Sequence, residues 1–290
     1  MAELIDQASL FIAAGVCAAA LGLTMLSVWL HNRADSFLVG WTLGMLLLGS
    51  GVVVYYTLPP DRLGIVATAF VMEIVGFVIV FIAACQFTRR ATTLRHWLVL
   101  SAAAPLVGVP IVLGYDGLGM MVYNFLAGSL LMATAMQYWN ARAEAPSCIA
   151  ALTTLYALSA VSFFGCGTII AHEQSWVMGV YPDNWAEKFN AIMCIAGITG
   201  IGALSLGLNH ARAARRHRED AETDMLTGLC NRRALFERMA GVAFGSGHAV
   251  ILFDLDRFKS INDGYGHAAG DEVLRRFAEA LRLNLREGDI

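Results

Sequence analysis

The sequence predicts an α-helical membrane domain of about seven helices, followed by a water-exposed domain of α/β structure. Apolar residues make up 57% of the 290 residues, and the mean hydropathy is positive. These values are typical of integral membrane proteins. Residues 1–208 hold seven Lys or Arg and ten Asp or Glu, whereas residues 209–290 hold thirteen of each. The first part is therefore expected in lipid and the second in water.

Seven apolar segments approach the roughly 20 residues that a helix needs to cross a bilayer. They are Ser9–Leu30, Phe37–Leu58, Gly64–Phe87, Trp97–Tyr115, Leu118–Trp139, Cys148–Ala171 and Glu187–Leu208. The first is too long for a cleaved signal and starts beside acidic rather than basic residues. The least secure step is the connection Tyr115–Leu118 after the fourth segment, because Pro105 and Pro110 can make that helix irregular.

Loop charges predict the orientation of the membrane domain. Basic residues gather in alternate loops, at Arg33, then Arg89, Arg90 and Arg95, then Arg142, and again after the seventh segment. The opposite side offers only Arg62 and Lys188. By the positive-inside rule, the amino terminus lies outside and the chain after residue 208 is cytoplasmic.

Three features of the membrane domain bear on function. Glu73 is the one acidic side chain placed near the middle of a segment, where charge is costly. It either belongs to a ligand- or proton-sensing pocket or is a hydrogen-bonded residue of the bundle interior. The outer loop 172–185 is a second candidate sensing surface, although its aromatic residues favour an interfacial anchor. The six cysteines lack C-x-x-C spacing, so neither disulfides nor a zinc site is expected.

Residues 209–224 lack Gly and Pro and predict a helical signalling linker between the membrane domain, 1–208, and a last domain, 225–290. A heptad register there gives either a short dimer contact or a solvated connector. Gly228 is expected to break the helix, and Asn231 to cap a new one. The apolar run Ala249–Phe253 then predicts a buried strand that ends at two acidic residues.

Residues 254–271 carry the strongest chemical signal. A strand-end carboxylate at Asp254 and a neighbouring main-chain carbonyl would supply oxygen ligands to a hard cation such as magnesium. Alone, the D-x-D pair is a weak signal and favours solvated strand-end acids, but the specific residues that follow it favour a site. Helical spacing predicts a helix from Asp271, with that residue as N-cap. Capping does not exclude the reading of a guanine edge by the same carboxylate.

Two motifs here carry a family resemblance: D-x-L-T-G-L-x-N-R-R at 224–233, and F-D-L-D-x-F-K-x-I-N-D-x-Y-G-H-x-x-G-D at 253–271. Together they resemble the amino-terminal half of a GGDEF domain, the catalytic domain of bacterial diguanylate cyclases. The similarity covers about residues 210–290. It implies an incomplete nucleotide-cyclase-like palm, a mostly antiparallel sheet flanked by helices, and a multi-pass protein of the bacterial inner membrane.

The resemblance also implies that a homodimer condenses two GTP into cyclic di-GMP and two pyrophosphates. No nucleic-acid partner is expected, and membrane lipid would surround the helices. Asp254 and the Leu255 carbonyl would bind Mg2+ or Mn2+, and the main chain at Arg257 and Phe258 would approach the phosphates. The remaining implied roles are phosphate charge compensation by Lys259, guanine reading by Asn262 and Asp271, and a nearby position for His267.

Residues 286–289 match the R-x-x-D inhibitory site of many of these enzymes, so Arg286 and Asp289 are candidates for binding cyclic di-GMP. The Gly-Gly-Asp/Glu-Glu-Phe signature loop is expected a few residues beyond Ile290. The 290-residue chain is therefore predicted to be inactive by itself. The alternative is a non-catalytic membrane signalling receptor with a degenerate or truncated GGDEF domain.

Overall fold

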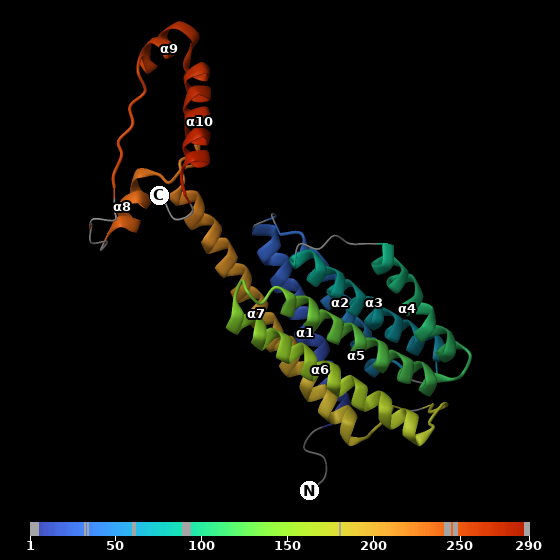
Figure 1. Cartoon of the computed structure of the whole chain (residues 1–290). Coiled ribbons are helices and arrows are strands. Elements are labelled where there is room, and N and C mark those ends of the chain that lie inside the picture. Colours follow the sequence, from blue (N-terminus) through green and yellow to red (C-terminus); the bar gives the residue numbers. More distant parts are fainter. Residues whose placement is uncertain are drawn as a thin grey trace. The chain divides into compact units, whose positions relative to one another are not determined.

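The structure, a computed structural model, describes residues 6–31, 33, 35–59, 62–88, 94–179, 181–240, 245 and 249–286. Its described part is helical (Figure 1). The helices are α1 (Gln7–His31), α2 (Phe37–Thr57), α3 (Leu63–Phe87), α4 (Leu94–Val112), α5 (Asp116–Asn140), α6 (Pro146–Glu173), α7 (Trp185–Glu222), α8 (Arg232–Met239), α9 (Phe258–Tyr265) and α10 (His267–Asn284). The chain divides into two compact units, Met1–Leu208 and Asn209–Ile290, and each is described by itself.

Six helices of the described part are long and apolar enough to cross a membrane: α1, α2, α3, α5, α6 and the Trp185–Arg215 part of α7. All six lie where the sequence predicts spans. Helix α4 differs, since it contains Pro105 and Pro110 and its described apolar stretch is only Ser101–Val112. The expectation of about seven spans, and of an outside amino terminus, therefore stays a prediction. Arg89 and Arg90, on which the orientation partly rests, lie outside the described residues.

Glycines allow the first helices to pack closely. A Cβ on Gly44 of α2 would lie 3.0 Å from the Gly76 carbonyl oxygen, and a Cβ on Gly76 of α3 would lie 2.9 Å from the Gly44 carbonyl oxygen. Helix packing in lipid depends on such small residues, because lipid is as apolar as the side chains and gives no hydrophobic drive between helices. Around this contact α1 packs on α2, α2 on α3, and α3 on both α4 and α5.

The predicted strand Ala249–Phe253 is not confirmed. Val250 is 81% exposed and Leu252 is 96% exposed, and the described part of the chain contains no strand, only an isolated bridge between Thr223 and Cys230. A strand is stabilised by cross-strand pairs and by a buried face, and the described residues provide neither for this run. The α/β class of the second unit therefore stays a prediction.

The predicted helix after the glycine-rich stretch forms, but its start differs. Helix α10 begins at His267, and Gly266, with φ of +84°, holds the N-cap position. The prediction that Asp271 caps this helix is wrong. The helix begins one turn earlier because Gly266 adopts the left-handed backbone that other residues avoid, which leaves Asp271 inside the helix.

Candidate functional site

The D-x-L-T-G-L-x-N-R-R segment forms a compact connection between α7 and α8. Asp224 Oδ1 accepts hydrogen bonds from the Thr227 hydroxyl at 2.7 Å and from the Thr227 N–H at 2.9 Å. The hydroxyl is the main cause that holds the pKa of Asp224 below its usual value. Gly228 turns the chain with φ of +64°, and its N–H donates to the Asp224 carbonyl oxygen. These bonds explain the spacing of the motif.

Asn231 joins the two helices on either side of this turn. Its Oδ1 accepts from the Ala234 N–H at 2.9 Å, which confirms the predicted cap of α8. Its Nδ2 donates to the Ala221 carbonyl oxygen at 2.7 Å, at the end of α7. The Asn231 amide therefore satisfies both the end of α7 and the start of α8. A further contact comes from α10, where Arg282 Nη2 donates to the Thr227 and Gly228 carbonyl oxygens.

The first candidate nucleotide residues lie just before α9. Asp254 is exposed, and Leu255 is half-buried with its carbonyl oxygen accepting from the Phe258 N–H at 3.2 Å. Arg257 adopts the left-handed conformation, with φ of +59°, at the N-cap position of α9. A carbonyl oxygen has a second lone pair. The Leu255 carbonyl and the Asp254 carboxylate can therefore still serve as oxygen ligands, the kind that a hard divalent cation prefers.

The later candidates are carried by α9 and α10. Lys259 and His267 are exposed, whereas Asn262 and Asp271 are half-buried. The Asn262 amide lies against Gly270, the residue before Asp271: a Cβ there would sit 3.0 Å from Asn262 Cγ and closer still to Oδ1. The two predicted guanine readers are thus brought to the same turn. Arg286 is exposed, and Asp289 lies outside the described residues.

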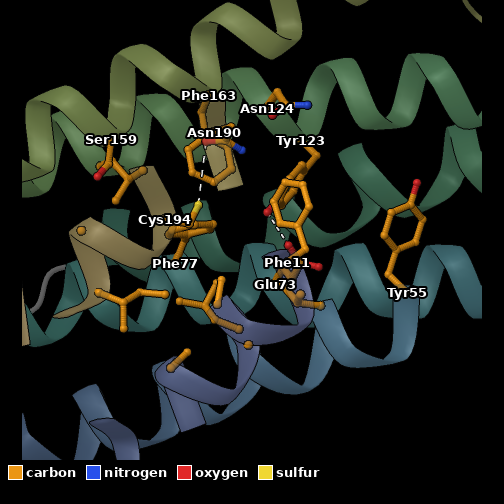
Figure 2. A pocket seen from close by; sticks show the side chains of 18 of the residues that line it. Phe11, Tyr55, Glu73, Phe77, Tyr123, Asn124, Ser159, Phe163, Asn190 and Cys194 are labelled. Carbon is orange, nitrogen blue, oxygen red and sulfur yellow. Dashed lines mark hydrogen bonds between the residues drawn. The ribbon is translucent and has the colours of Figure 1, made fainter. Parts of the chain in front are cut away.

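A second candidate site lies in the unit Met1–Leu208, called the membrane unit below. It is a cavity of about 120 Å³ that is lined by residues of α1, α2, α3, α5, α6 and α7. Glu73 lines it and accepts a hydrogen bond from the Tyr123 hydroxyl (Figure 2). Asn190 of α7 also lines it, and its Oδ1 accepts from the Ser162 hydroxyl at 2.7 Å and from the Cys194 thiol at 3.8 Å. In the described part, no group of three His, Cys, Asp or Glu has the arrangement of a metal site.

Sequence reasoning singled out Glu73 but missed the rest of this cavity. Glu187, the first residue of the seventh predicted segment, is only 7% exposed and lines the cavity. The missed signal is a helical one, since Glu187, Asn190, Cys194 and Gly197 recur at a spacing of three or four residues and all four line the cavity. In the outer loop, Tyr181 does not simply face the interface: its hydroxyl donates to the carbonyl oxygens of Tyr55 and Leu58, and burial raises its pKa.

Comparison with known proteins identifies the last segment. Residues 221–290 match the family described as diguanylate cyclase, GGDEF domain. Diguanylate cyclase DgcP of Pseudomonas aeruginosa is 44% identical over 88 residues, which cover 27% of this chain and 13% of that protein. Diguanylate cyclase DgcM of Escherichia coli is 43% identical over 75 residues, which cover 24% of this chain and 18% of that protein.

A longer likeness reaches into the membrane unit. Cyclic di-GMP phosphodiesterase NbdA of Pseudomonas aeruginosa is 29% identical over 226 residues, which cover 76% of this chain and 26% of NbdA. The chain thus spans about a quarter or less of each of these relatives. No solved structure matches the chain. The segment 221–290, which follows six long apolar helices, is therefore similar to the GGDEF domain family of diguanylate cyclases.

Proposed function

We propose that this chain is part of a membrane-bound diguanylate cyclase, which condenses two GTP into cyclic di-GMP and two pyrophosphates. The observation that carries the proposal is the presence of Asp254, Lys259, Asn262 and Asp271 in one segment that matches the GGDEF family. Asn262 and Asp271 would read the guanine, with His267 beside them. Lys259 would offset charge on the phosphates, which the main chain at Arg257 and Phe258 would approach.

The oxygen donors at Asp254 and Leu255 fit Mg2+ or Mn2+ as part of a site. A bound metal ion would neutralise phosphate charge and lower the pKa of the attacking hydroxyl. Because the reaction joins two GTP, each protomer of a homodimer would hold one substrate. The membrane bundle would lie in the bacterial inner membrane, surrounded by lipid, and control how the two cytoplasmic segments meet. Arg286 and Asp289 would bind the product and repress turnover.

The test is cyclic di-GMP production by the full-length membrane protein, measured by mass spectrometry after incubation with GTP and Mg2+. Asp254→Asn should abolish production, whereas Asp256→Asn serves as a matched control beside it in the same D-x-D pair. Arg286→Ala should relieve product inhibition. Equal production by wild type and Asp254→Asn would contradict the proposal.

Two other functions are distinguished by the same assay. The likeness to NbdA, which extends beyond the GGDEF segment, favours hydrolysis of cyclic di-GMP as a second candidate for the full-length protein. That activity would appear as loss of added cyclic di-GMP without production from GTP. A non-catalytic membrane receptor would neither produce nor hydrolyse cyclic di-GMP, and its signalling output would be the same in Asp254→Asn as in the wild type.

A further inference from the structure

The cavity inside the membrane unit has an unusual chemical composition. Two of its lining residues, Glu73 and Glu187, carry carboxyl groups, and they are only 6% and 7% exposed. The lining, which consists of described residues, contains no Lys, Arg or His. Buried charges in proteins are normally paired. The protein therefore places two buried acids around one space without supplying a positive side chain there.

Aromatic rings form much of the remaining wall. The Tyr123 ring, whose hydroxyl donates to Glu73, lies 4.8 Å from the Phe70 ring and 6.0 Å from the Phe163 ring. The ring centroids of Phe163 and Phe77 lie 5.4 Å apart, and all four aromatic residues line the cavity. Figure 2 shows Tyr123, Phe77 and Phe163 among them. Aromatic faces attract organic cations through their quadrupole, whereas a hard metal ion prefers a sphere of oxygen ligands.

An independent observation shows an unused polar group at the same place. Tyr156 lines the cavity, is 2% exposed, and its hydroxyl has no hydrogen-bond partner among the described residues. An unpaired buried hydroxyl is costly, because it loses its hydrogen bonds to water and gains none from the protein. A ligand with a polar group, or a water molecule held beside one, would restore that bond.

Part of the cavity wall is formed by the loop between α6 and α7, which several hydrogen bonds hold in place. Pro182, in the connection between α6 and α7, lines the cavity, and its carbonyl oxygen accepts from Gln7 Nε2 at 2.8 Å. The neighbouring Tyr181 is bonded to α2, as described above. Asp116, at the start of α5, accepts from the N–H groups of Met178 and Gly179. The same connection that sequence analysis named as a sensing surface thus forms part of the cavity.

We propose that this cavity is a binding site for a small organic cation, a primary or methylated ammonium compound, held between Glu73, Glu187 and the surrounding aromatic rings. A protein cavity of about 150 Å³ accommodates benzene, so a volume of about 120 Å³ suits a ligand of about five to seven non-hydrogen atoms. The ligand's charge would pair with the carboxylates, and its hydroxyl or hydration water would bond Tyr156. The proposal is independent of the cyclase function, because it concerns the membrane unit alone.

The experiment measures binding to the purified full-length protein in lipid nanodiscs by isothermal titration calorimetry. Choline is the probe, and 3,3-dimethyl-1-butanol is the control ligand, because it has the same size and shape with a neutral carbon in place of the charged nitrogen. Choline is expected to bind at least tenfold more tightly than the neutral isostere. Equal affinity for both, or no binding of choline, tetramethylammonium or butylamine at 50 mM, would overturn the proposal.

Variants locate the site without depending on a single residue. Glu73→Gln and Glu187→Gln should each weaken choline binding tenfold or more, whereas Asp183→Asn should leave it unchanged, since Asp183 is an exposed carboxylate paired with Lys188 and does not line the cavity. Tyr156→Phe removes a hydroxyl that has no partner in the described structure, so the variant should fold normally and lose affinity about threefold to tenfold. Unchanged affinity in all three cavity variants would place the ligand elsewhere and refute the assignment.

Discussion

Glu73 on α3 accepts a hydrogen bond from the Tyr123 hydroxyl on α5, fifty positions further along the chain. Both side chains are buried, at 6% and 5% exposure. A carboxyl group inside a membrane bundle is costly unless a neighbour satisfies it. This bond therefore ties two helices together at the wall of the cavity, and it settles which helix partners the acidic side chain in the middle of α3.

Tyr123→Phe should destabilise the membrane unit by about 1–3 kcal/mol, because it leaves a buried carboxyl oxygen without its donor. The measurement is thermal unfolding in detergent, followed by intrinsic fluorescence. Tyr55→Phe is the matched control: Tyr55 is equally buried, but among the described residues its hydroxyl donates a hydrogen bond only to the Met120 sulfur, at 3.8 Å. Equal unfolding temperatures for Tyr123→Phe and Tyr55→Phe would show that the bond contributes little.

Close packing of α2 on α3 gives a second prediction. In Gly76→Ala the new methyl group would meet Leu48 Cγ at 2.8 Å and the Gly44 carbonyl oxygen at 2.9 Å, so overpacking should cost about 1–3 kcal/mol. Gly64→Ala on the same helix meets nothing within 4 Å and should be neutral or slightly stabilising. Thermal unfolding of both variants separates the two cases. A Gly76→Ala protein as stable as Gly64→Ala would mean that the helices can move apart freely.

The helices of the membrane unit could be predicted from the sequence, because the hydrocarbon layer of a membrane permits few backbone conformations. Backbone groups in lipid must bond within their own segment, so an apolar run of sufficient length is a helix, and the predicted limits of α2 and α3 agree with the structure to within a residue or so. Helix α4 is the exception, because Pro105 and Pro110 lie inside it and each removes a backbone N–H donor. Which faces meet could not be predicted, since almost every position in these helices is apolar.

In the candidate sites too, local features could be predicted from the sequence and contacts between helices could not. The cap by Asn231 could be predicted because it is local, formed with a residue three positions away. The second bond of Asn231, to Ala221, needs the turn at Gly228 to be in place. The pairing of Glu73 with Tyr123 and the approach of Glu187 to the same cavity depend on how α3, α5 and α7 rotate against each other, which hydropathy alone does not encode.

Asn231→Ala should loosen the connection between α7 and α8, because it removes both the cap of α8 and the bond to the end of α7. Loss of an N-cap side chain costs about 0.5–2 kcal/mol. Hydrogen exchange of residues 221–235, followed by mass spectrometry on the intact protein, should show faster exchange. Asn284→Ala is the control, since Asn284 donates a hydrogen bond to the carbonyl oxygen of Ala280 in its own helix and joins no second helix within the described residues. Unchanged exchange in Asn231→Ala would contradict the bridging function.

Acid should loosen the same connection through Glu222. Hydrogen bonds from Arg218, at 2.6 Å, and from Arg238, at 3.2 Å, hold the pKa of Glu222 below its usual value. A lowered folded-state pKa contributes stability above the unfolded-state pKa of about 4.3, and this stability is lost as the pH falls through the folded-state value. Exchange at residues 221–240, corrected for its intrinsic pH dependence, should therefore be constant between pH 7 and about 5 and faster below about 4. Arg238→Gln should weaken this dependence, and an identical profile in that variant would argue against the ion pair.

Gly270→Ala tests whether the turn that joins α9 to α10 positions the proposed guanine readers. The new methyl group would collide with the Asn262 amide, which lies against Gly270, and would displace it from Asp271 on the next position of the chain. Because a hydrogen-bonding site rejects a ligand whose partners are misplaced, the full-length protein should lose at least tenfold in GTP affinity, measured with a fluorescent GTP analogue. Gly264→Ala, where a Cβ meets nothing within 4 Å, should retain affinity. If Gly270→Ala bound GTP as well as Gly264→Ala, Asn262 and Asp271 would not form one recognition site, and guanine would have to be read elsewhere.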